Sequence, residues 1–186
     1  TFRERVAGRK LILLEPNTPY RGVFLSYFLR HPHNGPLYYR IGASETTVPA
    51  MIRGLATEME AALGKQGEIF AQPLREALQD PSAPRLAEAL AAGLAALRLE
   101  PATLFLDEFD RLQVNADFHT FVISLAHHLG RKTQIVINSR ALRAQPWYDL
   151  VVRGDAVVLG DERAIHAGML AAEGAFKPQI EVFGFG

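Results

Sequence analysis

The sequence predicts a three-layer α/β domain built on a parallel sheet of about five strands, because short apolar runs alternate with amphipathic helical stripes. At 186 residues, the chain has the length of one domain with a single core. One apolar run, within Thr103 to Arg111, ends in the adjacent carboxylates Asp107 and Glu108. Open α/β sheets bind ligands at the carboxyl ends of their strands, so this acid pair marks a candidate site.

Five runs have the apolar character of buried strands, at residues 10–14, 37–41, 103–106, 134–138 and 156–159. The first is followed by the segment EPNTP at residues 15–19, whose prolines and asparagine predict a loop. Since the runs are separated by helical patterns, we expect parallel pairing with right-handed crossovers.

Four segments have helical spacing of apolar residues. The first covers residues 22–31, and the second has its apolar stripe at Met51, Leu55, Met59 and Leu63. Ser82 is the expected N-cap of the third, residues 84–99, with Pro84 in its first turn. The fourth has its apolar residues at Phe118, Phe121, Val122 and Leu125.

Composition narrows the functional classes. Twenty basic residues balance twenty acidic ones, so the chain has no global electrostatic attraction for nucleic acid or for an anionic membrane. No apolar run approaches the roughly 20 residues that a membrane span needs. The absence of cysteine excludes a disulfide framework and thiolate chemistry, and it fits a cytoplasmic protein.

Three motifs follow three of the predicted strands: EPNTPYRG at 15–22, LDEF at 106–109 and INSR at 137–140. In these motifs, and over roughly residues 9 to 170, the chain resembles the additional-strand P-loop nucleotidases. Within them it is most similar to the STAND-type, AAA-like ATPase domain of bacterial transcriptional regulators of the LuxR and maltose-activator kind. The resemblance implies a P-loop NTPase-like sheet of order 5-1-4-3-2 and an NTPase domain over residues 1–176.

The resemblance also implies a site for ATP or ADP with Mg²⁺. The first motif would be the phosphate loop, LDEF the doubly acidic Walker B, and INSR the strand end that senses nucleotide. Asp107 would then hold Mg²⁺, and Glu108 and Arg140 would be the catalytic residues. The implied cofactor-binding residues are Thr18, Tyr20, Arg21, Gly22 and Ser139.

The first motif departs from the family pattern. With Arg21 at the position of the family's lysine, Glu15 and Tyr20 stand where glycines should, and Gly22 stands where a hydroxyl should ligate Mg²⁺. Glycines let the loop adopt unusual backbone conformations and bring its N–H groups close to phosphate. Arginine is a planar fork rather than a compact ammonium group.

We therefore expect a degenerate nucleotide-binding or signalling module with weak or absent ATP hydrolysis. The alternatives are an active, atypical Mg-dependent ATPase and a purely protein-interaction or scaffolding domain.

Each motif also has a simpler interpretation. Asp107 and Glu108 could cap a helix, and Ser139 with Arg140 could form a strand-end turn with a surface salt bridge. Asp107, Glu108 and Asp110 could instead bind Mg²⁺ for phosphoryl transfer without a phosphate loop.

Two further kinds of chemistry have weaker support. Ser139 could act as a nucleophile, but it lacks the glycines of a G-x-S-x-G elbow. His127 and His128 have no third metal ligand nearby in the sequence.

The C-terminal residues 177–186 predict a linker followed by a strand, from Lys177-Pro178 into QIEVFGFG. This phrase resembles the opening strand of a winged-helix DNA-binding domain. The resemblance implies that the chain, which begins at Thr1 without Met, is a piece of a longer regulator. Its partners would be other domains of that regulator, and DNA would be bound only through the C-terminal domain. A homo-oligomer would be possible, and no membrane contact is expected.

Overall fold

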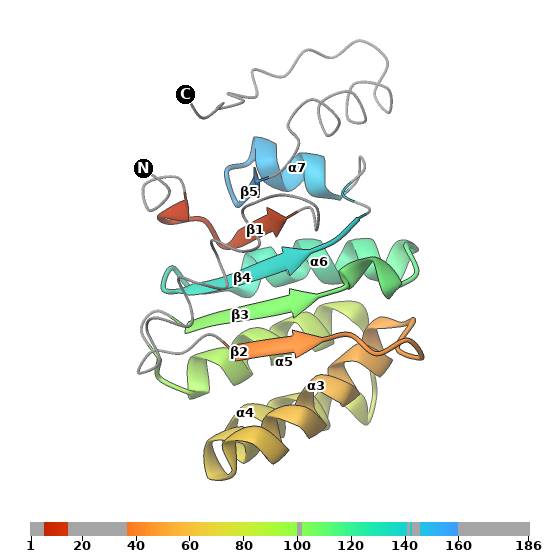
Figure 1. Ribbon diagram of the computed structural model, residues 1–186, viewed down its shortest axis with the longest axis vertical. Helices are drawn as coiled ribbons and strands as arrows, with labels where there is room; N and C mark the ends of the chain where they lie inside the picture. Colours follow the sequence, from red (N-terminus) through yellow and green to blue (C-terminus); the bar gives the residue numbers. More distant parts are fainter. Residues whose placement is uncertain (1–5, 15–36, 100–101, 141, 143–145, 160–186) are drawn as a thin grey trace.

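The computed structural model describes residues 6–14, 37–99, 102–140, 142 and 146–159. Five strands form one sheet in the order β2-β3-β4-β1-β5, and every neighbouring pair is parallel (Figure 1). The strands are β1 (Leu11–Leu14), β2 (Leu37–Arg40), β3 (Ala102–Asp107), β4 (Thr133–Asn138) and β5 (Ala156–Leu159). Counted from its other edge the order is 5-1-4-3-2, so the predicted α/β class, the parallel pairing and the strand order are confirmed.

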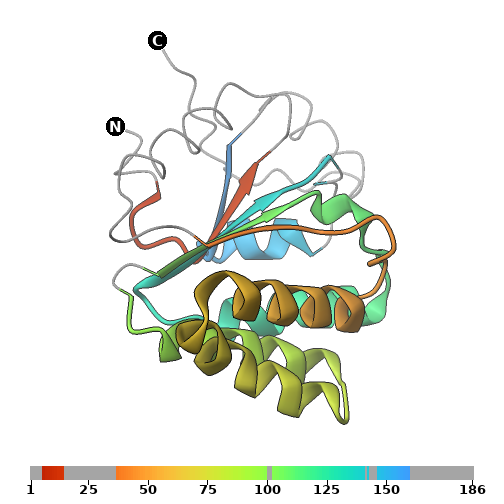
Figure 2. The ribbon, with the colours of Figure 1, turned by 60° about the horizontal axis from the view of Figure 1, so that its bottom comes forward.

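Helices connect the strands and pack on the sheet. Between β2 and β3 lie α3 (Val48–Leu63), α4 (Lys65–Leu78) and α5 (Ala83–Ala96). A 3-10 turn, η2 (Phe109–Arg111), and α6 (Ala116–His128) follow β3, and α7 (Trp147–Val152) precedes β5. Figure 2 shows these helices against the same face of the sheet. The helix expected at 22–31 lies outside the described residues.

Side chains on both faces of the central strands are buried. The larger core cluster joins the sheet to α3, α4, α5, α6 and α7, and Leu11 and Leu13 belong to it. The alternate residues of β1, Ile12 and Leu14, belong to a smaller cluster on the opposite face. The other buried members of this cluster are Phe105, Val136 and Leu159, from β3, β4 and β5. Burial on both faces is the usual environment of parallel sheets in α/β domains, and it explains why the strands are continuous apolar runs.

Local sequence explains where the long helices begin. The Thr47 hydroxyl accepts a hydrogen bond from the N–H of Ala50 at 3.3 Å, and Pro49 occupies the first turn of α3. Ser82 stands at the N-cap of α5, as expected, although its side chain makes no capping bond. The Asn115 side chain accepts from the N–H of Phe118 at 2.9 Å and caps α6.

The helices α4 and α7 were not among the predicted elements. Helix α4 packs Phe70, Ala71, Leu74 and Ala77 against its neighbours, and it contains Pro73. It packs very closely on α3, and glycine at position 67 makes this possible. A Cβ atom there would lie only 2.1 Å from the carbonyl oxygen of Met59 in α3. None of the helices in the described parts of the chain is long and apolar enough to cross a membrane.

The parallel register brings the predicted motifs to one edge of the sheet. Leu14, the last residue of β1, pairs with Asn138, the last residue of β4. The N–H of Ser139 then donates to the carbonyl oxygen of Leu14 at 2.9 Å. On the other side of β4, β3 ends at Asp107, which pairs with Arg40 at the end of β2.

Candidate functional site

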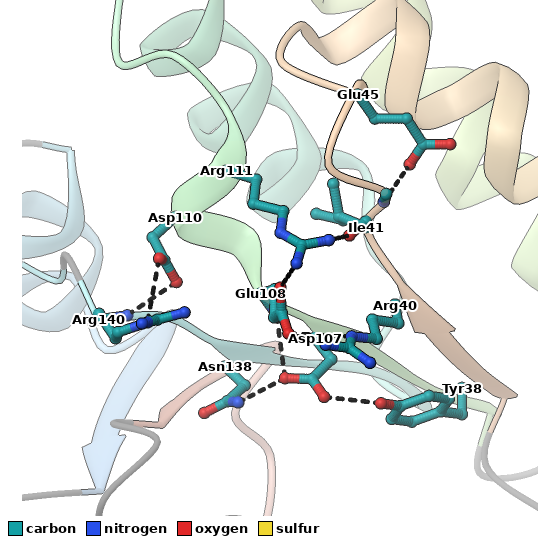
Figure 3. Close-up of polar contacts among 11 residues, drawn as sticks. Tyr38, Arg40, Ile41, Glu45, Asp107, Glu108, Asp110, Arg111, Asn138 and Arg140 are labelled. Atoms are coloured by element: carbon teal, nitrogen blue, oxygen red, sulfur yellow. Dashed lines mark hydrogen bonds and ion pairs between the residues drawn. The ribbon is translucent and has the colours of Figure 1, made fainter.

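Asp107 is the centre of the site and is almost completely buried, with 1% of its surface exposed. Its Oδ1 atom accepts hydrogen bonds from Asn138 Nδ2 at 2.5 Å and from the N–H of Glu108 at 2.9 Å. Its Oδ2 atom accepts from the Tyr38 hydroxyl at 2.6 Å (Figure 3). These donors compensate the burial of a carboxylate, which would be very unfavourable without them.

The Glu108 side chain points away from Asp107, and its carboxylate lies between two arginines (Figure 3). Oε1 of Glu108 accepts from Arg40 Nε at 2.9 Å and Nη2 at 2.5 Å, and Oε2 pairs with Arg111. The hydrogen bond to Glu108, followed by its negative charge, raises the pKa of Arg40. Arg111 also donates to the carbonyl oxygen of Ile41 at 2.5 Å, so the network ties the end of β2 to the turn after β3 (Figure 3).

The backbone of Glu108 is in the left-handed helical region, with φ 57° and ψ 43°. Residues with a Cβ atom adopt this conformation at a cost of roughly 1–2 kcal/mol. Glu108 is followed directly by η2, so the strained residue forms the corner between strand and turn. This corner directs the Glu108 side chain toward β2 and its arginine.

Arg140 and Asp110 form a separate pair. The N–H of Arg140 donates to Asp110 Oδ1 at 3.1 Å, and its Nε atom lies 3.4 Å from Asp110 Oδ2. The Arg140 side chain is 68% exposed, so it can reach a bound anion from this position. Ser139, in contrast, is 2% exposed at the end of β4. The interpretation of this motif as a strand-end turn with a surface salt bridge therefore has direct structural support.

Four residues of the site were not predicted as site residues from the sequence: Tyr38, Arg40, Arg111 and Asn138. Asn138 is 2% exposed and orients Asp107 through its amide nitrogen. Its Oδ1 atom is buried and, within the part of the chain that the structure describes, has no hydrogen-bond partner. A buried acceptor of this kind is suited to a water molecule or to a ligand that donates a hydrogen bond. The signal in the sequence was a lone amide at the end of a buried apolar strand.

The expected phosphate loop cannot be placed against these residues. Thr18, Tyr20, Arg21 and Gly22 lie outside the described residues, as do residues 160–186 with the predicted boundary at 176. Among the expected site residues, the structure therefore locates Asp107, Glu108, Ser139 and Arg140 at the same sheet edge.

The arrangement around Asp107 does not fit Mg²⁺. Mg²⁺ needs oxygen lone pairs in octahedral geometry, whereas two N–H groups and one hydroxyl direct their hydrogens at the Asp107 carboxylate. Glu108 is bound to two guanidinium groups, and Asp110 is bound to a third. No group of three His, Asp or Glu residues that could hold a metal occurs in the described ranges.

Other simple interpretations can also be compared with the geometry. Helix α6 is capped by Asn115, and Asp107 instead accepts from the N–H of the residue next to it, so the acid pair does not cap that helix. His127 and His128 are exposed at the end of α6. Ser139 is buried at a strand end and has no G-x-S-x-G elbow around it, which gives no support to a nucleophilic role.

Comparisons with known proteins add no family assignment. A scan against protein-family models found no match, and a search of curated proteins found no match either. The STAND resemblance therefore stays a prediction from the motifs.

Proposed function

We propose that this chain is a degenerate P-loop-type nucleotide-binding and signalling module of a bacterial transcriptional regulator, with weak or no ATP hydrolysis. One observation carries the proposal. The two acids lie where a nucleotidase needs them, at the carboxyl end of β3 beside β4, but protein groups already bind their carboxylates. The order of the strands and of the motifs favours descent from a P-loop nucleotidase. The hydrogen bonds and ion pairs of Asp107 and Glu108 disfavour ATP hydrolysis.

Hydrolysis needs a base that can reach the attacking water. Both carboxylate oxygens of Glu108 are instead paired with Arg40 and Arg111. The Arg40–Glu108 pair lies at the surface, where ion pairs contribute only about 0–1 kcal/mol, so a bound ligand could open it. The first motif, with Tyr20 and Arg21 in place of glycine and lysine, offers little phosphate binding to drive that opening.

Nucleotide binding without turnover is compatible with the exposed arginines. The side chains of Arg40 and Arg140 are 61% and 68% exposed at the same edge of the sheet. Guanidinium groups bind phosphate through paired hydrogen bonds. If Arg140 exchanged Asp110 for a phosphate, the turn after β4 would lose one of its connections to η2. Such an exchange would couple nucleotide binding to a change of conformation.

In this proposal the module acts in the cytoplasm with other domains of the same regulator. DNA would be bound through the C-terminal domain that residues 177–186 introduce, and self-association would be one way to transmit the signal.

The test is a thermal-unfolding titration with ATP and with ADP, each with Mg²⁺ and with EDTA, beside a hydrolysis assay. A ligand at about 100 times its Kd adds about 2.7 kcal/mol to the free energy of unfolding. We expect a nucleotide-induced shift that Arg140→Ala reduces and that Arg98→Ala, an exposed arginine outside the site, leaves unchanged.

The outcomes separate the three functions. Mg-dependent turnover that is lost in Glu108→Gln would replace the proposal with the atypical ATPase. The absence of any shift at millimolar nucleotide would favour the scaffolding domain.

A further inference from the structure

We propose that the Tyr38 hydroxyl occupies the place of a metal ion at Asp107. Asp107 then links the strands β2, β3 and β4 through hydrogen bonds, without a metal ion. It follows that a nucleotide at this edge binds without Mg²⁺. The second statement rests on the proposed function, whereas the first concerns only this chain.

The Tyr38 ring is held in place by its neighbour on β3. Tyr38 pairs with Phe105 across the β2–β3 ladder, and the two rings are stacked with centroids 5.6 Å apart and an interplanar angle of 29°. Phe105 is itself 1% exposed, so this stacking surface is fixed. Asp107 lies two residues beyond Phe105 and projects from the same face of β3. The stacked ring therefore directs its hydroxyl to Asp107 Oδ2 at 2.6 Å (Figure 3).

Asn138 completes the joint from the opposite side. Its amide nitrogen donates to Asp107 Oδ1 at 2.5 Å, from the end of β4. Asp107 thus connects side chains of β2 and β4 from its own position in β3, between them. The N–H of Glu108 is a second donor to Oδ1. Each carboxylate oxygen therefore has a protein hydrogen directed at it.

These donors and the surrounding charges oppose a cation. An N–H group cannot ligate a metal, and Mg²⁺ at Oδ2 would compete with the hydroxyl hydrogen that now points there. The guanidinium groups of Arg40 and Arg111, which bind the adjacent Glu108, add repulsion between like charges. The hydroxyl supplies Asp107 with a neutral donor where a metalloenzyme would supply a cation.

The test is a double-mutant cycle of Tyr38→Phe and Asp107→Asn, read by urea unfolding in EDTA, in millimolar MgCl2, and in MgCl2 with ATP. The cycle isolates the interaction between the two side chains. We expect a coupling of roughly tenfold in the unfolding equilibrium constant, because hydrogen bonds to charged groups are strong, and we expect it to be equal in all three solutions. Tyr39→Phe is the matched control, since Tyr39 bonds to Glu45 and should show no coupling to Asp107→Asn.

A second measurement uses only the mild variant. In Tyr38→Phe, the hydroxyl hydrogen no longer points at Oδ2 of Asp107, so MgCl2 should stabilise this variant more than the wild-type protein. This comparison carries the test if Asp107→Asn does not fold.

The proposal is overturned by a coupling that is absent in EDTA, or by one that disappears when MgCl2 or Mg-ATP is added. It is also overturned if MgCl2 fails to stabilise Tyr38→Phe beyond wild type. Failure of the proposed function has a different signature, because wild type would then show no nucleotide shift in any solution. The coupling in EDTA and in MgCl2 alone would still report on the Tyr38–Asp107 bond.

Discussion

Replacing Glu108 by glycine should leave the protein more stable than replacing it by alanine, the reverse of the usual order. Both substitutions remove the ion pairs with Arg40 and Arg111, so their difference reports on the backbone. At φ 57° a Cβ atom costs roughly 1–2 kcal/mol. The greater freedom of glycine in the unfolded chain returns about 0.4–1 kcal/mol of that. The two ranges subtract to about 0–1.6 kcal/mol, so the expected net advantage of Glu108→Gly over Glu108→Ala is about 0.8 kcal/mol, the middle of that range.

The assay is urea unfolding of both variants, supported by thermal unfolding, in which about 1 kcal/mol corresponds to about 2–4 °C for a chain of this size. Arg98 is the matched control, because it has φ 52° and lies exposed just after α5, outside the acid network. Arg98→Gly should likewise exceed Arg98→Ala in stability. If the order is normal at position 108 and reversed at position 98, Glu108 does not have the left-handed conformation in solution and our account of the corner is wrong.

Two more predictions concern the packing of α3 on β2. Gly54→Ala should destabilise the protein, because the added Cβ would lie 2.0 Å from Glu45 Oε1 and 2.1 Å from the Tyr39 hydroxyl. This loss should exceed the gain of about 1 kcal/mol that alanine brings to a helix. Gly130→Ala, where the nearest atom to the added Cβ is 3.9 Å away, should be nearly neutral in the same unfolding assay. Burial, followed by the hydrogen bond to Glu45, raises the pKa of Tyr39. Stability from this residue is therefore complete below the unfolded-state pKa of about 10 and falls above it, by at most about 1.4 kcal/mol per pH unit. Tyr39→Phe should flatten that decline between pH 9 and 11.5 in roughly this range, and an unchanged slope would show that Tyr39 ionises normally in the folded protein.

The sheet was predictable because strands that are buried on both faces have apolar residues at every position, as at Leu11–Leu14. Helix α4 was harder to recognise. Its buried face has only two large side chains, Phe70 and Leu74, beside the small residues Gly67, Ala71 and Ala77. Pro73 within it is a residue that ordinarily ends a helix. Helix α7 has only six residues, too few for a periodic pattern to repeat.

The site was predictable only in part, for a different reason. Adjacent acids after a strand indicate an edge, but the hydrogen-bond partners of those acids depend on which strands lie beside them. Tyr38 and Asn138 meet Asp107 only because β2 and β4 flank β3. The left-handed backbone of Glu108 has no sequence signal, since glycine or asparagine would be the usual residue there.

The position of β1 in the sheet has a consequence for how the protein is made. Among the five described strands, β1 is synthesised first, whereas its two neighbours in the sheet, β4 and β5, are synthesised last. Contacts that span so much of the chain form slowly, and unpaired apolar strand edges promote aggregation until they form. The four consecutive apolar residues of β1 therefore stay unpaired until β4 and β5 have been synthesised. A nascent chain stopped before residue 156 should engage chaperones or aggregate rather than fold as a smaller domain.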